Sequence, residues 1–263
     1  MTKQPRRQND VVRGVRDLFG DGYLSAGTED LHVHTQACND SDQSAEQALA
    51  DAIEHGIEVV CFTAHVRLDT PVQHVLSYLE SIDEASEQFG QLTIRRSVET
   101  KLLDVAGNLD LPPELDLSVL DTVHIADHRF PLDSDAAPRE VAAQLANGEL
   151  TERAAWEALV ESTCHALQQY PPAIVAHPLS IIPKIGLDQS DLPTDLADHW
   201  AHVMAKHESV MEINNKWDCP GLSLVRAAHA AGVPVVSASD AHHAGETGRQ
   251  SYRDVVVAEL GTG

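Results

Sequence analysis

Residues 30–35, Asp-Leu-His-Val-His-Thr, alternate acidic or imidazole side chains with apolar ones, which predicts a buried β-strand. Side chains two apart on a strand lie on the same face, so His32 and His34 can reach one metal ion together. A single histidine that ends a strand is more often a hydrogen-bonded core residue. Two in this spacing instead predict a strand that carries metal ligands.

Six more apolar stretches end on or near a residue that can bind a metal. They are residues 61–65, 97–99, 125–128, 175–177, 211–214 and 239–242. In the last stretch, Asp240 and His242 are two apart and are expected to share a face. Buried His, Asp and Glu side chains cost free energy unless they are paired or bound to metal. Seven such strands in one chain therefore predict a shared metal site.

Helical patterns separate the predicted strands. They cover residues 44–56, 71–89, 138–169, 194–207 and 220–231. Ser44 with Gln47 is typical of a capping box, Gly56 and Gly232 are placed to end helices, and 138–169 divides into two helices near Gly148. Alternating strands and helices predict a parallel α/β fold. Because the candidate ligands lie at the C-terminal ends of the strands, we expect a distorted (β/α)7 barrel with its metal site there.

A chain of 263 residues can form one large α/β domain, and no linker divides it. We expect residues 1–27 to be a mobile N-terminal extension and residues 28–263 to form a single barrel domain. Arg6-Arg7 is similar to a twin-arginine signal, but no apolar segment or cleavage site follows. No run of about 18 apolar residues predicts a membrane span. We expect a cytoplasmic protein whose four cysteines are reduced thiols.

The formal net charge of -23 argues against binding to long nucleic acid. Proteins that bind nucleic acid gain affinity when Lys and Arg side chains neutralise phosphates. A local group of cations can still hold a small anion, so a small phosphorylated substrate remains compatible with this charge.

The motifs, in their order along the chain, resemble those of the polymerase and histidinol phosphatase (PHP) superfamily. The residues that carry the resemblance are Asp-Leu-His-Val-His-Thr at 30–35, His65, Val98-Glu99, His128, Ala176-His177-Pro178, Glu212-Ile213-Asn214 and Ser239-Asp240-Ala241-His242. The match runs from about residue 29 to residue 243. The resemblance implies a distorted seven-stranded barrel with a trinuclear metal site.

The resemblance also implies which residues hold each ion. His32, His34, Glu99 and Asp240 would hold the first, Glu99 would bridge to a second held by His128 and His177, and Asp40, His65 and His242 would hold the third. Asp40 lies in a predicted loop, where an Asp that caps a turn is an alternative. The mixed donor set suits two or three divalent ions of manganese, zinc or iron.

One departure from the family concerns the third ion. Family members carry Asp-His where this chain has Ala64-His65, so a carboxylate that could orient His65 is absent. Outer-shell partners of this kind tune metal affinity by about 10- to 100-fold. The other two positions do not depend on Ala64.

Clustered divalent ions suit hydrolysis of a phosphoester by activated water. The chain has no G-x-S-x-G elbow and no P-loop, so no covalent nucleophile is predicted. The catalytic candidates are Asp240, His242 and Glu212. Glu212 could orient a ligand, donate a proton to the leaving oxygen, or simply bind backbone amides. Asp30 could fix the tautomer of His32, and His124 could be either an outer-shell donor or a core histidine.

Five cationic side chains are placed to contact a phosphate near the predicted metal site. They are Lys101, Arg129, Lys184, Lys216 and Arg249. Each alone is expected to be a solvated surface charge. Together they form candidates for an anion clamp, and Arg129 and Lys184 are the favoured pair.

The resulting hypothesis is a histidinol-phosphatase-like metal-dependent phosphatase that acts on a small phosphate monoester. One alternative is a nucleotide phosphatase or a phosphodiesterase on short oligonucleotides, in which Trp217 would have to stack on a base. Another is a non-catalytic, metal-stabilised interaction module. The sequence predicts no oligomeric state.

Overall fold

The computed structural model describes residues 24, 27–132, 135–170 and 172–261, so most of the expected N-terminal extension lies outside the described residues. Within this part, seven parallel strands form one sheet in the order β1-β2-β3-β4-β7-β8-β9. The strands are β1 (Glu29–Val33), β2 (Val59–His65), β3 (Thr93–Lys101), β4 (Thr122–Ala126), β7 (Ile174–Ala176), β8 (Val210–Asn214) and β9 (Val235–Ala238). A short hairpin, β5 (Phe130–Pro131) with β6 (Asp135–Ala136), follows β4.

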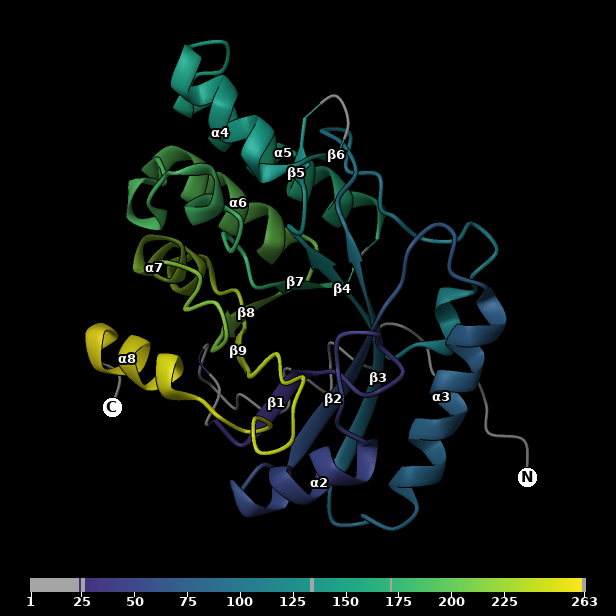
Figure 1. Ribbon diagram of the computed structural model, residues 1–263. Helices are drawn as coiled ribbons and strands as arrows, with labels where there is room; N and C mark the ends of the chain where they lie inside the picture. The colour runs from purple at the N-terminus through teal and green to yellow at the C-terminus, as the bar shows by residue number, and fades with distance from the viewer. Residues whose placement is uncertain (1–23, 25–26, 133–134, 171, 262–263) are drawn as a thin grey trace.

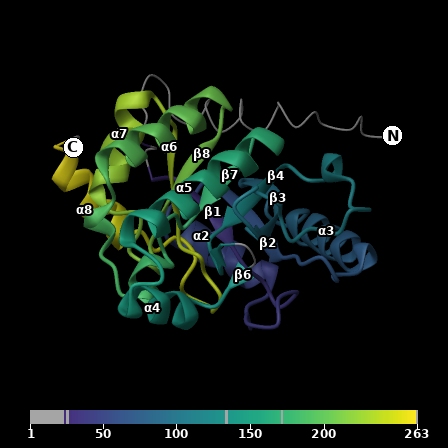
Figure 2. The same ribbon diagram turned by 90° about the horizontal axis from the view of Figure 1, so that it is seen from above.

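Helices connect the strands and lie around the outside of the sheet (Figures 1 and 2). They are α2 (Ala45–Glu54), α3 (Val72–Ser86), α4 (Pro138–Asn147), α5 (Glu152–Gln169), α6 (Thr194–Lys206), α7 (Leu222–Ala231) and α8 (Ser251–Leu260). The strands form a nearly closed barrel, which confirms the predicted distorted (β/α)7 architecture. No helix in the described part of the chain is both long and apolar enough to cross a membrane.

Capping residues and glycines in the sequence predicted most helix ends correctly. Ser44 and Gln47 form the predicted capping box at the start of α2. Gly148 and Gly232 end α4 and α7 with φ angles of 78° and 74°, a conformation that glycine adopts without steric cost. Helix α8 was not predicted, because it buries only Val256 and so has no apolar stripe to recognise.

The expected strand at residues 239–242 is wrong. β9 ends at Ala238, and the segment that follows contains Asp240 in a left-handed conformation with φ of 55°. A residue in this conformation cannot continue an extended strand. Asp240 and His242 therefore lie in the loop after β9, and their convergence on the site depends on that turn.

A bulge in β1 decides which of its side chains enter the barrel. Asp30 pairs with Val60 and Val33 with Phe62, so Leu31 and His32 together lie opposite one residue of β2, Cys61. Leu31 packs with Cys61 in an apolar cluster, whereas Val33 packs in the larger core on the other face. The bulge thus lets Leu31 and His32 both face the barrel interior.

The barrel interior has an apolar floor. Its members are Leu31, Val59, Cys61, Ile174, Val210 and Val236, all buried and drawn from five strands. Further toward the C-terminal ends of the strands, the same faces carry polar groups: Glu99 pairs with His65 on β2 and with His124 on β4. The polar layer is therefore closed from below by packed side chains.

Side-chain carboxylates close the seam between β1 and β9. These two strands are the ends of the sheet order, and they touch without a full ladder. Asp30 Oδ1 accepts from the Ser239 N–H at 2.9 Å and Asp30 Oδ2 from the Gly248 N–H at 2.7 Å. Glu29 Oε1 accepts from the Ser237 N–H at 2.9 Å. The two carboxylates therefore take the place of backbone acceptors that β1 does not offer.

We predict that Asp30→Asn destabilises the fold although it preserves shape. Both oxygens of Asp30 accept backbone N–H groups, so either orientation of an amide leaves a donor facing a donor. An unsatisfied buried group costs about 1–3 kcal/mol, which denaturant unfolding would measure.

The matched control is Asp116→Asn. Asp116 is exposed and accepts from the Ser118 N–H, a role that asparagine fills equally well. Equal midpoints for the two variants would contradict the role assigned to Asp30.

Candidate metal centre

Glu99 is the centre of a buried group of histidines. Its side chain is 1% exposed, and five imidazoles approach its two oxygens. The contacts are His177 Nε2 and His128 Nε2 with Oε1 at 2.8 and 2.9 Å, and His65 Nδ1, His32 Nε2 and His34 Nε2 with Oε2 at 2.7, 3.6 and 3.6 Å. Each comes from β1, β2, β4 or β7 or the residues that directly follow them, so strand order brings them together.

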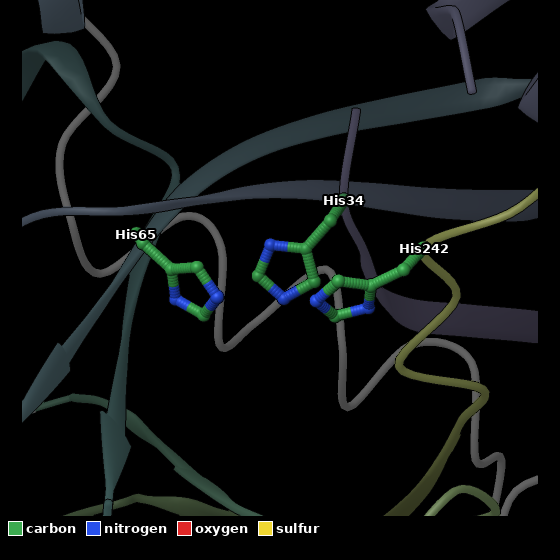
Figure 3. A group of neighbouring side chains, drawn as sticks. All are labelled: His34, His65 and His242. Carbon is green, nitrogen blue, oxygen red and sulfur yellow. The ribbon is translucent and has the colours of Figure 1, made fainter. Parts of the chain in front are cut away.

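Several ring nitrogens of the cluster face one another at short distance. His32 Nε2 and His34 Nε2 are 2.9 Å apart, where only one proton or one metal ion can lie between them. The rings of His34, His65 and His242, which come from three separate segments, lie in a row with nitrogens turned toward one another (Figure 3). Glu99 Oε2 and His65 Nδ1 lie 2.7 Å apart, but the angle between them is not that of a hydrogen bond, and among the described residues neither buried atom has a hydrogen-bond partner.

Outer partners hold the other ring nitrogen of several of these histidines. His32 Nδ1 lies 3.0 Å from Glu212 Oε2, and His177 Nδ1 lies 3.3 Å from Asp127 Oδ1. His242 Nδ1 lies 2.8 Å from the carbonyl oxygen of Asp240. An acceptor at Nδ1 places the proton there and leaves Nε2 directed at the centre, as in metal-binding histidines generally.

Burial and charge shift the pKa values of the histidines in different directions. Burial lowers the pKa of His34 to about 3, so its ring is neutral. Burial also disfavours charge on His65 and His177, but Asp40 and Glu99 raise the pKa of His65 to about 9, and Asp127 and Glu99 raise that of His177 to about 10. The carboxylates thus attract positive charge, whether carried by protons or by metal ions.

The arrangement fits divalent metal. Facing Nε2 atoms, a buried carboxylate oxygen without a hydrogen bond, and Nδ1 atoms tied to acceptors are the features that a His and carboxylate site requires. Among the described residues, sets of three ligand atoms lie within 4.8 Å of one another in four groups: His34, His65 and His242; His32, His34 and Glu99; His65, Glu99 and His128; and His32, His124 and Glu212.

The structure brings all nine predicted ligands into one region. Asp240 Oδ1 lies 3.5 Å from His34 Nε2, and Asp40 Oδ2 lies 3.1 Å from His65 Nε2 and 3.6 Å from His242 Nε2. Asp40 is the outermost, with 56% of its side chain exposed. His65 also contacts Glu99, so it lies between the predicted third position and the other two.

Hydrogen bonds show the roles of Asp30, His124 and Glu212, which the sequence leaves open. Asp30 does not orient the ring of His32: its carboxylate binds backbone N–H groups, because the bulge separates the two side chains. His124 is a core histidine, with Nε2 on the Leu31 carbonyl oxygen and Nδ1 on Ser97 Oγ. Glu212 is fully buried and contacts His32 and Asn214, so it holds a ring in place.

A pocket of about 480 Å³ lies over the histidine cluster. Four of the five predicted cations line it: Lys101, Arg129, Lys184 and Lys216. Arg249 lines a neighbouring pocket of about 370 Å³ that shares Asp40, Lys216, Asp240 and His242 with the first. The predicted anion clamp is therefore divided between two adjoining pockets.

Three contributors were missed from the sequence. Arg67 lines the larger pocket and donates to His128 Nδ1 at 3.1 Å. Cys38 Sγ lies 3.4 Å from His34 Nδ1, and Asp127 holds His177 and also accepts from Ser180 Oγ. Arg67 and Asp127 adjoin predicted ligands in the sequence, which is a usable signal, whereas nothing in the sequence indicates that Cys38 reaches His34.

Comparison with known proteins agrees with this geometry. The sequence pattern that describes the PHP domain matches residues 30–216. The histidinol phosphate phosphatase of Lactococcus lactis subsp. lactis Il1403, solved with zinc, L-histidinol and phosphate, has a similar fold with a TM-score of 0.63. It is 16% identical over 90% of this chain and 94% of its own, a likeness that shows the fold alone.

A second solved structure is less similar. The N-isopropylammelide isopropylaminohydrolase of Burkholderia multivorans ATCC 17616 has a TM-score of 0.43 at 17% identity, over 77% of this chain and 51% of its own. A search of curated protein sequences found no match.

We predict that metal binding releases protons and tightens as the pH rises. The raised pKa values of His65 and His177, about 9 and about 10, and the raised pKa of His32 leave these three rings protonated near neutral pH without metal. An incoming ion must displace these protons, so apparent affinity should increase from about pH 7 toward pH 9. Calorimetry in buffers of different ionisation enthalpy should detect release of about three protons per protein.

The control variant is Asp127→Asn, which removes the largest contribution that raises the pKa of His177. It should reduce proton release by about one. Binding that releases no protons would show that the three protonated rings are not ligands.

Proposed function

Because the chain belongs to the PHP domain family and is a metal-dependent phosphoesterase, we propose that it hydrolyses a small phosphate monoester. The observation that carries this proposal is the buried histidine cluster around Glu99, which lies at the floor of a pocket walled by cations. The cluster suits divalent ions and the wall suits phosphoryl oxygens.

We assign the ligands by contact. His32, His34, Glu99 and Asp240 form the first group, His128 and His177 share Glu99 Oε1 in the second, and Asp40, His65 and His242 form the third. Two or three ions of zinc, manganese or iron suit this donor set. Zinc is the first to test, since the Lactococcus enzyme of similar fold was solved with it.

The ions, when bound, supply Lewis acidity that activates water and neutralises phosphoryl charge. The chain's own residues position the reactants. Glu212 and Asp127 hold the rings of His32 and His177 in place. Lys216 Nζ lies 3.6 Å from Asp240 Oδ1, and Arg67 reaches His128, so both cations adjoin ligands and can bind phosphoryl oxygens.

The bond changes are those of a simple hydrolysis. The water oxygen gives up one proton and forms a bond to phosphorus, the bond from phosphorus to the ester oxygen breaks, and the leaving alcohol takes up one proton. Asp240 and His242 line the floor of the pocket and would act in catalysis by holding metal ions. Glu212 would act indirectly, by holding the ring of His32 in place.

A nucleotide phosphatase or a phosphodiesterase on short oligonucleotides is the second candidate. Trp217 lines the pocket with 39% of its surface exposed, and an exposed aromatic ring can stack on a base. One face of the ring is already covered by Lys184, whose ammonium lies 3.8 Å from the ring centroid. The monoester therefore remains the first choice.

We predict that His34→Ala and Asp240→Ala abolish phosphate release while the barrel stays folded. Loss of a ligand should reduce turnover by more than the roughly 10- to 100-fold expected for an outer-shell partner. Phosphate release would be measured with zinc- and manganese-loaded protein on sugar phosphates, histidinol phosphate, nucleotides and a dinucleotide, with circular dichroism to confirm folding.

His202→Ala is the matched control, because His202 is an exposed histidine on α6 outside the cluster. It should keep full rate. A mononucleotide released from the dinucleotide would favour the second candidate, and full rate in His34→Ala would refute the site.

A further inference from the structure

The charge of the larger pocket is opposite to that of the chain. The chain has 41 Asp and Glu against 18 Lys and Arg, yet five cations line this pocket: Arg67, Lys101, Arg129, Lys184 and Lys216. The acidic lining residues are Asp40, Glu99 and Asp240, and all three are assigned as metal ligands. Apart from the ligand set, the lining consists of these cations and Trp217.

One phosphoryl group does not use all of this charge. Bound divalent ions would offset the three ligand carboxylates and contact the phosphoryl oxygens themselves. Arg67 and Lys216 adjoin ligands and can complete the same contacts. A volume of about 480 Å³ is that of a small-metabolite site, so the pocket has room beside the remaining cations for a part of the substrate beyond the reacting phosphorus.

Of these remaining cations, Lys184 has the best-defined position beside the metal centre. It is exposed at the pocket, and among the described residues no carboxylate lies within ion-pair distance of it. Its Nζ lies 3.8 Å from the centroid of the Trp217 ring, and the Nε1–H of Trp217 donates to Asp240 Oδ2 at 3.0 Å. The indole therefore holds a cation near the metal centre, but one side chain away from its ligands.

Resting on the proposed function, we propose that the substrate carries a second anionic group, a carboxylate or another phosphoryl group, which Lys184 binds from its platform on Trp217. Arg129 lines the same pocket and extends the cationic wall, and Lys101 adds to it although Asp110, 3.5 Å from its Nζ, offsets part of its charge. A substrate whose second group is an ammonium would meet repulsion there.

The first test compares small esters that share a carbon skeleton. With metal-loaded full-length protein, phosphoglycolate should have a kcat/KM roughly tenfold or more above ethyl phosphate, since a charge-assisted hydrogen bond is worth about that factor. Phosphoethanolamine should fall below both. Comparing glycerol bisphosphate with glycerol phosphate then distinguishes a second phosphoryl group from a carboxylate. Equal values throughout, or a preference for the ammonium, would overturn the proposal.

The second test assigns the preference to Lys184. Lys184→Met should reduce the ratio between phosphoglycolate and ethyl phosphate to about threefold or less. Lys206→Met is the matched control: Lys206 is an exposed lysine near the end of α6 that does not line the pocket, and its loss should leave the ratio unchanged. A ratio that survives Lys184→Met would overturn the assignment.

Variants of Trp217 separate its two contacts. Trp217→Phe keeps a ring beneath Lys184 and loses the bond to Asp240, whereas Trp217→Leu loses both. The ratio should therefore persist in Trp217→Phe and decline in Trp217→Leu. The same ratio in both would show that the ring does not position Lys184.

A binding measurement keeps this proposal distinct from the proposed function. Calorimetry with the inert analogues phosphonoacetate and ethylphosphonate should show tighter binding of phosphonoacetate, again lost in Lys184→Met. This preference without phosphate release from any ester would refute the proposed function and leave the second anion site standing. Phosphate release without a preference for phosphonoacetate would support the proposed function and refute the second anion site.

Discussion

The burial of the Glu99 carboxylate among five imidazoles is the constraint on which the rest of the structure depends. A buried charge is costly unless opposite charge lies beside it. Burial opposes ionisation of Glu99, but the charges of His128 and His32 outweigh it and hold its pKa well below the usual range. The barrel accommodates this charge through its layers, with an apolar floor below and partners supplied by successive strands.

The sequence predicted the strands because each has a dense local pattern. Alternation in residues 30–34 and the apolar stretches at 61–65 and 211–214 identified β1, β2 and β8. The bulge in β1 left no trace in that pattern, because an extra residue changes which side chains face inward without changing their order. The expectation for Asp30 was wrong for this reason: it assumed regular alternation through Leu31.

Contacts made across loops could not be read from the sequence. Cys38 meets His34 because the chain turns back after β1, and Arg67 meets His128 because β2 and β4 end at the same face of the barrel. Asp240 reaches the cluster through a left-handed residue rather than along a strand. The candidate ligands were therefore accessible from residue type and order, whereas the partners that orient each ring required the fold.

The carboxylate seam also bears on how the chain folds. Asp30 and Ser239, which meet there, are 209 residues apart along the chain. Contacts between distant segments close late, after the loop entropy of the intervening chain has been lost. During synthesis, β1 emerges long before the segment that satisfies its carboxylates, so the barrel cannot close until nearly the whole chain is available. The seam and the contacts that Asp240 and His242 make with the cluster both need the segment after β9, so neither can form before that segment has been made.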